Sequence, residues 1–224
     1  MKYYKFELNL IWANILSVVL FVLGFIFLLF TYKPIEFTEY GVGKLLIGML
    51  LYLMIHEIIH GLAFSCFCKD KRSVKYGAAL EKGVLYAMCQ ERISKKAIII
   101  SLLAPTIVLT LLALIPSYIF RIDLLAILAI FNLAGATGDL LMTLFVIKLP
   151  NNIQYIDYDS VIGFYLLSKD DLSKYKSPFL RYIESGKDSD KLINKDIKPL
   201  TITKASWIIF IILIIFVIIS CISM

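Results

Sequence analysis

Five long stretches of this sequence carry almost no charge, and each is close to the length that a helix needs to cross a lipid bilayer. A transmembrane helix requires about 20 consecutive, mainly apolar residues. Hydrophobic residues make up 60% of the chain and charged residues only 18%, a balance typical of membrane proteins. The sequence therefore predicts a mainly α-helical fold, a polytopic transmembrane bundle of about five spans. The stretches lie at approximately residues 8–30, 45–68, 97–120, 122–147 and 205–224.

Two connections between the predicted spans are expected to form structure of their own. Residues 75–91 have aromatic and branched residues on both sides of Lys82-Gly83, which predicts a β-hairpin at the membrane surface. Residues 149–204 are expected to form a small cytoplasmic α+β segment, with a strand pair around residues 157–160 and one short helix. The predicted organisation is a transmembrane core over residues 1–148, this segment at 149–204, and a C-terminal transmembrane helix at 205–224.

The basic residues predict the orientation of the chain, because short cytoplasmic loops carry an excess of Lys and Arg. Residues 69–96 contain eight basic and three acidic residues, whereas residues 31–44 contain two of each. We therefore expect a multi-pass protein of the cell membrane with residues 69–96, residues 149–204 and the N-terminus in the cytoplasm. The net charge of +6 lies mainly in the first of these loops. It indicates contact with anionic membrane lipids and requires no nucleic acid.

The stretch HEIIH, residues 56–60, contains both histidines of the chain. Residues four apart lie on one face of a helix, so His56 and His60 point to one position and Glu57 flanks it. This is the arrangement of HExxH helices, which bind zinc through two histidines beside a glutamate base. A buried hydrogen-bonded cluster or a proton relay between helices is the alternative. The predicted spans contain no Lys or Arg that could neutralise Glu57, which favours a metal.

A catalytic zinc site has three protein ligands and one open position, so the two histidines need a partner. Of the 17 acidic residues, only Glu57 and Asp139 fall well inside a predicted span. Asp139 lies at about the same predicted depth as His56, and the glycines on either side of residue 137 allow close helix packing. Asp139 is therefore the preferred third ligand, with a helix-to-helix hydrogen bond as its alternative role.

Three other side chains are weaker candidates for the third ligand. Glu81 and Glu91 lie 21 and 31 residues after His60, where soluble zincins often have a glutamate ligand. Their position in a loop favours solvated charges. Cys66 falls on a different helix face from His60. The four cysteines form no CxxC pair, which predicts reduced thiols with a packing role.

Several stretches together resemble a known family, namely HEIIHGLAF, SLLAPTIVLTLL and NLAGATGDLL, followed by YIDYDSVIGFYLL. They resemble the bacterial multi-pass membrane proteins of uncharacterised function that are grouped as the "putative zincin peptidase" family. They are more distantly similar to intramembrane site-2 proteases, although the chain lacks the proline-rich run that precedes the aspartate there. The resemblance covers roughly residues 45–170. It implies zinc ligation by His56, His60 and Asp139, a base at Glu57, and a substrate-holding amide at Asn132.

The residues themselves leave the role of Asn132 open. It lies seven residues before Asp139, about two helical turns away and on the same face. There it could hydrogen-bond the substrate backbone, orient a ligand, or bond to another helix. Asp157 and Asp159 could also contact substrate, but turn formation explains them equally well.

These observations predict a membrane-embedded zinc metalloprotease that hydrolyses a peptide bond at or within the cytoplasmic side of the bilayer. Zn²⁺ would be its cofactor, and a peptide or a membrane protein its substrate. Two other functions stay open, a non-hydrolytic membrane zinc-binding or transport protein and a regulatory protein with a degenerate zincin site. Well inside the spans there are no further acidic or histidine residues to form a conduction path. An intact Glu57 favours the protease over the degenerate site. The sequence specifies no oligomeric state.

Overall fold

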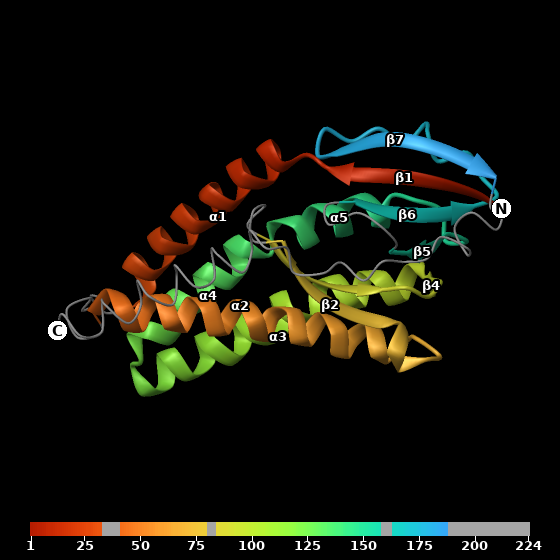
Figure 1. The fold of residues 1–224 in the computed structure, drawn as a ribbon. Helices are drawn as coiled ribbons and strands as arrows, with labels where there is room; N and C mark the ends of the chain where they lie inside the picture. Colours follow the sequence, from red (N-terminus) through yellow and green to blue (C-terminus); the bar gives the residue numbers. More distant parts are fainter. Residues whose placement is uncertain (33–40, 80–83, 158–162, 188–224) are drawn as a thin grey trace.

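The computed structural model of the chain describes residues 1–32, 41–79, 84–157 and 163–187. Within these residues, a group of elongated helices packs side by side, and a β-sheet covers one end of the group (Figure 1). The helices are α1 (Leu10–Thr31), α2 (Gly41–Ser65), α3 (Lys95–Phe120), α4 (Asp123–Gly135) and α5 (Thr137–Ile147), with a short 3-10 helix η2 (Lys71–Ser73).

Three helices, α1, α2 and α3, are long and apolar enough to cross a membrane, and α4 with α5 makes a fourth if the bent pair is one span. They correspond to the first four predicted spans. The fifth, at residues 205–224, lies outside the described residues. Large apolar side chains stand exposed along the helices, for example Val18 at 64% and Leu112 at 63%. Such faces are suited to contact with lipid.

The fourth predicted span is not one continuous helix, which corrects the expectation for residues 122–147. Helix α4 ends at Gly135, α5 begins at Thr137, and the two axes differ by 46°. Glycine has a low helix propensity, and here two glycines flank the break. The Ala134 carbonyl accepts a hydrogen bond from the Thr137 hydroxyl at 2.6 Å. The bend starts a new helix two residues before Asp139.

The sheet is antiparallel, with the strand order β4-β5-β6-β1-β7. The strand pair expected around residues 157–160 is confirmed as β5 and β6, although its turn lies outside the described residues. The N-terminal strand β1, which was not predicted, lies between β6 and β7. The expected short helix does not occur in the described part of residues 149–187, which contains only strands and turns. The strands are β1 (Lys2–Leu8), β4 (Ile93–Ser94), β5 (Gln154–Ile156), β6 (Gly163–Ser168) and β7 (Leu180–Lys187).

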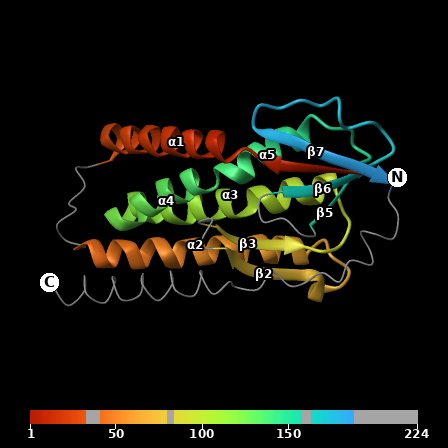
Figure 2. The ribbon, with the colours of Figure 1, turned by 45° about the horizontal axis from the view of Figure 1, so that its top comes forward.

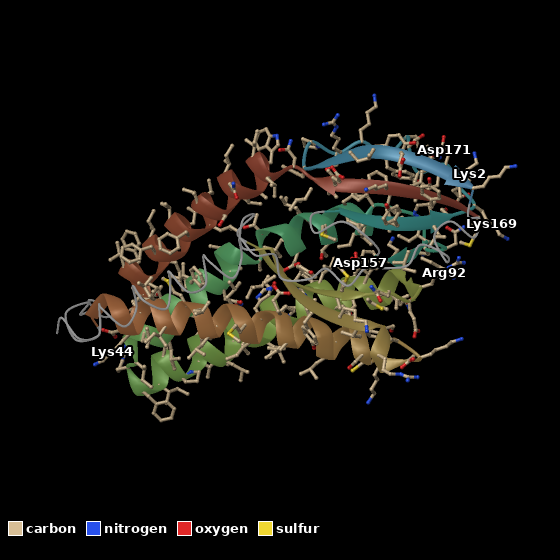
Figure 3. All side chains as sticks on the ribbon, viewed as in Figure 1. Lys2, Lys44, Arg92, Asp157, Lys169 and Asp171 are labelled. Carbon is tan, nitrogen blue, oxygen red and sulfur yellow. The ribbon has the colours of Figure 1, made fainter. Side chains whose placement is uncertain are left out.

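The sheet joins three distant parts of the chain at one end of the helices. The N-terminal residues, the two residues just before α3 and the segment after α5 all contribute strands to it. Lys2, Arg92 and Lys169 lie at this end, whereas Lys44 lies at the opposite end (Figure 3). This agrees with the prediction that the N-terminus, residues 69–96 and the segment after residue 148 share one side of the membrane.

A buried aromatic and aliphatic cluster fastens the sheet to the helix ends. Tyr4 and Phe6 point inward from alternate positions of β1, which follows the two-residue period of a strand. The Lys95 ammonium group at the start of α3 donates hydrogen bonds to the carbonyls of Ile147 and Leu149, so it ties α3 to the end of α5. The cluster includes Tyr4, Phe6, Phe64, Ile98, Leu102, Phe145, Tyr155, Phe164 and Leu166.

The predicted hairpin is confirmed as strands β2 (Val74–Ala79) and β3 (Val84–Cys89), while its turn at Lys82-Gly83 lies outside the described residues. The hairpin runs back along the C-terminal half of α2 (Figure 2). A Cβ at Gly61 would overlap the ring of Tyr76, so the glycine after His60 lets β2 pack closely on the helix. The hairpin thereby forms one wall beside HEIIH.

Candidate metal centre

Helix α2 brings the three polar residues of HEIIH to one place. His56 and His60 are both buried, and their ring centroids lie 4.8 Å apart. One ligand atom from each of His56, Glu57 and His60 lies within 4.8 Å of the other two. The predicted placement on one helix face is confirmed, and the group could hold a metal ion.

Asp139 reaches the two histidines from the first turn of α5. Its Oδ2 atom lies 3.2 Å from Nε2 of His56 and 3.2 Å from Nε2 of His60. The bend between α4 and α5 starts the second helix just before this residue, which turns its carboxylate toward α2. The structure therefore places the aspartate, both histidines and Glu57 around one point.

The other ring nitrogen of His60 is held by the main chain of α3. Nδ1 lies 2.8 Å from the carbonyl oxygen of Ser101. In a regular helix this carbonyl would accept the N–H of residue 105, but residue 105 is proline and has no N–H. Pro105 thus leaves the Ser101 carbonyl free for His60. The sequence signal was present in SLLAP, since a proline inside an apolar span marks an unpaired carbonyl four residues earlier.

The other ring nitrogen of His56 is held by a side chain of α4. Nδ1 lies 2.8 Å from Oδ1 of Asn132. The Asn132 amide nitrogen faces three acceptors on α3, the carbonyls of Pro105 and Thr106 at 3.3 and 3.5 Å and the Thr110 hydroxyl at 3.0 Å. These contacts fix the amide with its oxygen toward the histidine.

These two hydrogen bonds decide which ring nitrogens face Asp139. A carbonyl or amide oxygen only accepts, so Nδ1 carries a proton in both rings, and in the neutral rings both Nε2 atoms have free lone pairs. Two imidazole lone pairs and a carboxylate oxygen then converge, as in metal sites whose histidines are oriented by outer hydrogen bonds. Two ligand atoms about 2.1 Å from a tetrahedral zinc ion are about 3.4 Å apart. The observed 3.2 Å separations fit that geometry.

Comparison with known proteins agrees with this geometry. Residues 49–154 match the sequence model of a family described as "Putative zincin peptidase". This region belongs to that family. It extends from α2 into β5 and contains all four residues of the candidate metal centre, which confirms the resemblance found in the sequence. No curated protein and no solved structure matches the chain.

The zincin motif opens onto a cavity of about 320 Å³, which Glu57 lines together with both histidines and Asp139. The opposite walls come from α1 and from β3. The backbone N–H of Ala87 in β3 lies within hydrogen-bonding reach of the Glu57 carboxylate. The glutamate therefore faces open space beside the histidines, as a general base requires.

The structure distinguishes the weaker candidate ligands from the preferred one. Glu91 accepts hydrogen bonds from the backbone N–H groups of Lys69 and Asp70, both at 2.8 Å, and so closes the loop after α2. Glu81 lies outside the described residues. Cys66 is an exposed free thiol at the end of α2. Among the described candidates, Asp139 alone contacts both histidines.

The contacts of Asn132 favour two of its three open roles. The side chain is buried, and its oxygen and nitrogen both face protein groups. The residue therefore orients His56 and joins α4 to α3. The substrate-holding role implied by the family resemblance stays a prediction.

Sequence reasoning left Asp157 open between substrate contact and turn formation and gave no role to Tyr155, yet both residues line this cavity. The Tyr155 hydroxyl donates to Oδ1 of Asp157 at 2.7 Å, and the Asp157 N–H donates to the Cys89 carbonyl at 3.0 Å. Burial raises the pKa of Asp157 to about 7, while the hydrogen bond from Tyr155 acts in the opposite direction. Near neutral pH this group therefore changes charge at the edge of the cavity.

Proposed function

We propose that this protein is a membrane-embedded zinc metalloprotease that hydrolyses a peptide bond at or within the cytoplasmic side of the bilayer. The observation that carries this proposal is the convergence of two histidine Nε2 atoms on one oxygen of Asp139, with Glu57 beside them. His56, His60 and Asp139 would hold the metal. Membership of residues 49–154 in the zincin peptidase family supports it.

The residues divide the chemistry between them. Bound zinc would supply Lewis-acid activation of water and of a peptide carbonyl. Glu57 takes a proton from the attacking water and later delivers it to the leaving amine. Asn132 and the Ser101 carbonyl keep Nδ1 protonated on each histidine and so hold each Nε2 toward Asp139.

The outer edge of β3 supports a peptide as the substrate. In an antiparallel pair, backbone groups of alternate residues point away from the partner strand. The Cys89 carbonyl points away from β2, toward Asp157, so the backbone groups of Ala87 and Leu85 point the same way. Both residues line the zincin cavity. An extended peptide could pair with this edge and lie across the site.

The position of Glu57 along α2 supports the proposed depth of cleavage. It lies eight residues before the end of α2, about 12 Å along the helix axis from the sheet end. The sheet end carries the basic residues that favour the cytoplasmic side. A substrate would therefore be cut near the cytoplasmic end of its membrane segment.

The test combines metal analysis with cleavage in cells. Wild type and Glu57→Gln would each be co-expressed with tagged single-span membrane proteins, and fragments cut near the cytoplasmic ends of their helices would be measured. Loss of a general base should lower cleavage by about two to four orders of magnitude. Zinc content and folding should persist, because glutamine preserves size and Glu57 is not a proposed ligand.

The matched control is Glu91→Gln, the same substitution at a glutamate whose carboxylate closes the loop after α2. It should retain cleavage. Undiminished cleavage in Glu57→Gln would exclude the HExxH mechanism. Stoichiometric zinc in a wild type that cleaves none of the test proteins would instead favour a non-hydrolytic zinc-binding or regulatory function.

A further inference from the structure

Helix α1 carries an unusual pair of polar side chains. Between Leu10 and Phe30, Asn14 and Ser17 are the only residues with an amide or hydroxyl group in their side chains. The remaining residues of this stretch suit a helix in lipid. An amide in a membrane span costs free energy unless it has a hydrogen-bond partner, so a role for Asn14 needs to be found.

The two polar residues face the proposed active site. Asn14 and Ser17 line the same cavity as His56 and Glu57. Two further residues of α1, Leu10 and Ala13, line it as well. Positions 10, 13, 14 and 17 form one face of a helix, so the polar pair belongs to the single stripe of α1 that points toward the site.

Neither polar side chain has a hydrogen-bond partner among the described residues. Asn14 is exposed and Ser17 half-buried. Within the described part of the chain, this amide therefore does not join helices as Asn132 does. Its donors and acceptor stay available to whatever enters the cavity.

We propose that Asn14, together with Ser17 one turn further along, binds the main chain of an extended peptide substrate on the side opposite the β3 edge. This inference rests on the proposed protease function. A peptide that enters an apolar cavity loses hydrogen bonds to water, and a carboxamide offers both a donor and an acceptor that replace them. The Asn14 amide has the same polar groups as a peptide unit. Asn14 is a substrate-binding residue in this scheme, and the proton transfers stay with Glu57.

The test measures binding separately from cleavage. All variants would carry Glu57→Gln, so that the zinc-loaded protein holds peptide without cutting it. The probe is a fluorescein-labelled 12-residue peptide that spans the cleavage position of a test protein. Analogues of the probe would carry one N-methylated backbone nitrogen each. Fluorescence anisotropy gives the Kd of each pair of protein and probe.

Asn14→Leu should weaken binding of the unmodified probe about three- to tenfold, the value of one hydrogen bond. N-methylation of one backbone nitrogen of the probe should weaken its binding to the protein that retains Asn14 but not to Asn14→Leu. The N-methyl group and the leucine substitution remove the same hydrogen bond, so their effects should not add. Asn14→Gln, which keeps the amide, should recover part of the loss. Ile15→Leu is the matched control, since Ile15 is exposed on the adjacent face and does not line the cavity.

A purely structural role for Asn14 gives a different result. Thermal unfolding of Asn14→Leu would then occur at a lower temperature, whereas removal of an unpartnered amide should leave the unfolding temperature unchanged or raise it. Equal binding by the Asn14→Leu variant and its parent Glu57→Gln protein, or an equal N-methylation penalty in both, would overturn the inference. Either result would leave the proposed function intact, because Glu57-dependent cleavage by the Asn14 protein tests that function separately.

Discussion

The two histidines of the metal centre are held by two different regions, and by different kinds of acceptor. His60 donates to a main-chain carbonyl in the second turn of α3, which Pro105 leaves free. His56 donates to the side chain of Asn132 in the last turns of α4, and that side chain is fixed in turn by α3. Both arrangements leave Nε2 facing Asp139.

We call the hydrogen-bond acceptor of each histidine Nδ1 its anchor. The anchor of His60 is a main-chain carbonyl, which is rigid, whereas the anchor of His56 is a side chain. No substitution at Ser101 deletes its carbonyl, so the His60 anchor changes only indirectly, through the proline. The His56 anchor disappears with a single change at Asn132. Substitutions should therefore affect the two sides of the centre unequally, in an order that measurement can check.

The largest loss of zinc is expected for a change at Asp139, which both histidine Nε2 atoms face. Asp139→Ala removes the oxygen that both Nε2 atoms face, so zinc per protein should fall from about one to near zero, as it should in His60→Ala. Mass spectrometry of the metal in purified protein measures this, with circular dichroism to verify folding. Retention of zinc by Asp139→Ala, with loss in Glu81→Ala, would show that the third ligand was assigned to the wrong residue.

The side-chain anchor should give the next effect. Asn132→Leu keeps the approximate size but removes the acceptor for His56 Nδ1, and zinc affinity should fall about 10- to 100-fold, as for other outer-shell partners. Competition with a fluorescent zinc chelator gives the affinity. Asn132→Asp is the control. Its carboxylate still accepts a hydrogen bond from His56 Nδ1, so this variant should keep most of the zinc affinity.

A different outcome for Asn132 would identify its other proposed role. If Asn132→Leu binds zinc as wild type does but raises the KM for a peptide, the residue holds substrate, as the family resemblance implies. Asn132 would then not be needed to hold His56 in the zinc site.

The main-chain anchor should respond less. Pro105→Ala restores an N–H that can bond to the Ser101 carbonyl. A carbonyl has two lone pairs, so His60 shares it rather than losing it. Zinc affinity should fall about two- to tenfold, less than for Asn132→Leu. Pro116→Ala is the matched control in the same helix, about 16 Å further along. An equal loss in both proline variants would point to a general change in α3.

The smallest loss of zinc affinity is expected at Thr110, which contacts Asn132 and not a histidine. Thr110→Val removes one of three acceptors for the Asn132 amide while it keeps the side-chain shape. The carbonyls of Pro105 and Thr106 stay in place, so zinc affinity should fall about twofold at most. The same chelator competition measures it. A loss as large as that of Asn132→Leu would show that Thr110 alone fixes the amide.

Part of this site was accessible from the sequence because local spacing determines it. Residues 56–60 place their side chains on one helix face wherever that helix packs. Asp139 could be selected because it is the one acid besides Glu57 well inside a predicted span. The bend at residue 136 was not foreseen, since two glycines in a span are also compatible with close packing of a straight helix.

The strand pairing in the sheet could not be predicted from local sequence patterns. Strand β1 has only seven residues and precedes an apolar run, so nothing local indicates that it pairs with β6 and β7, more than 150 residues away. The described residues between 169 and 187 do not form the expected short helix, because Leu180–Lys187 pairs with β1 as strand β7.

The sequence by itself determined the apolar spans, the two paired segments outside them, and the HExxH face with its aspartate, because each depends on the spacing and composition of neighbouring residues. Only the tertiary structure decided which acceptors hold the two histidines, that the hairpin lies along α2, and that the polar stripe of α1 faces the cavity. Those features arise where distant segments meet, and the geometry of packing between helices and strands is not encoded in any one segment.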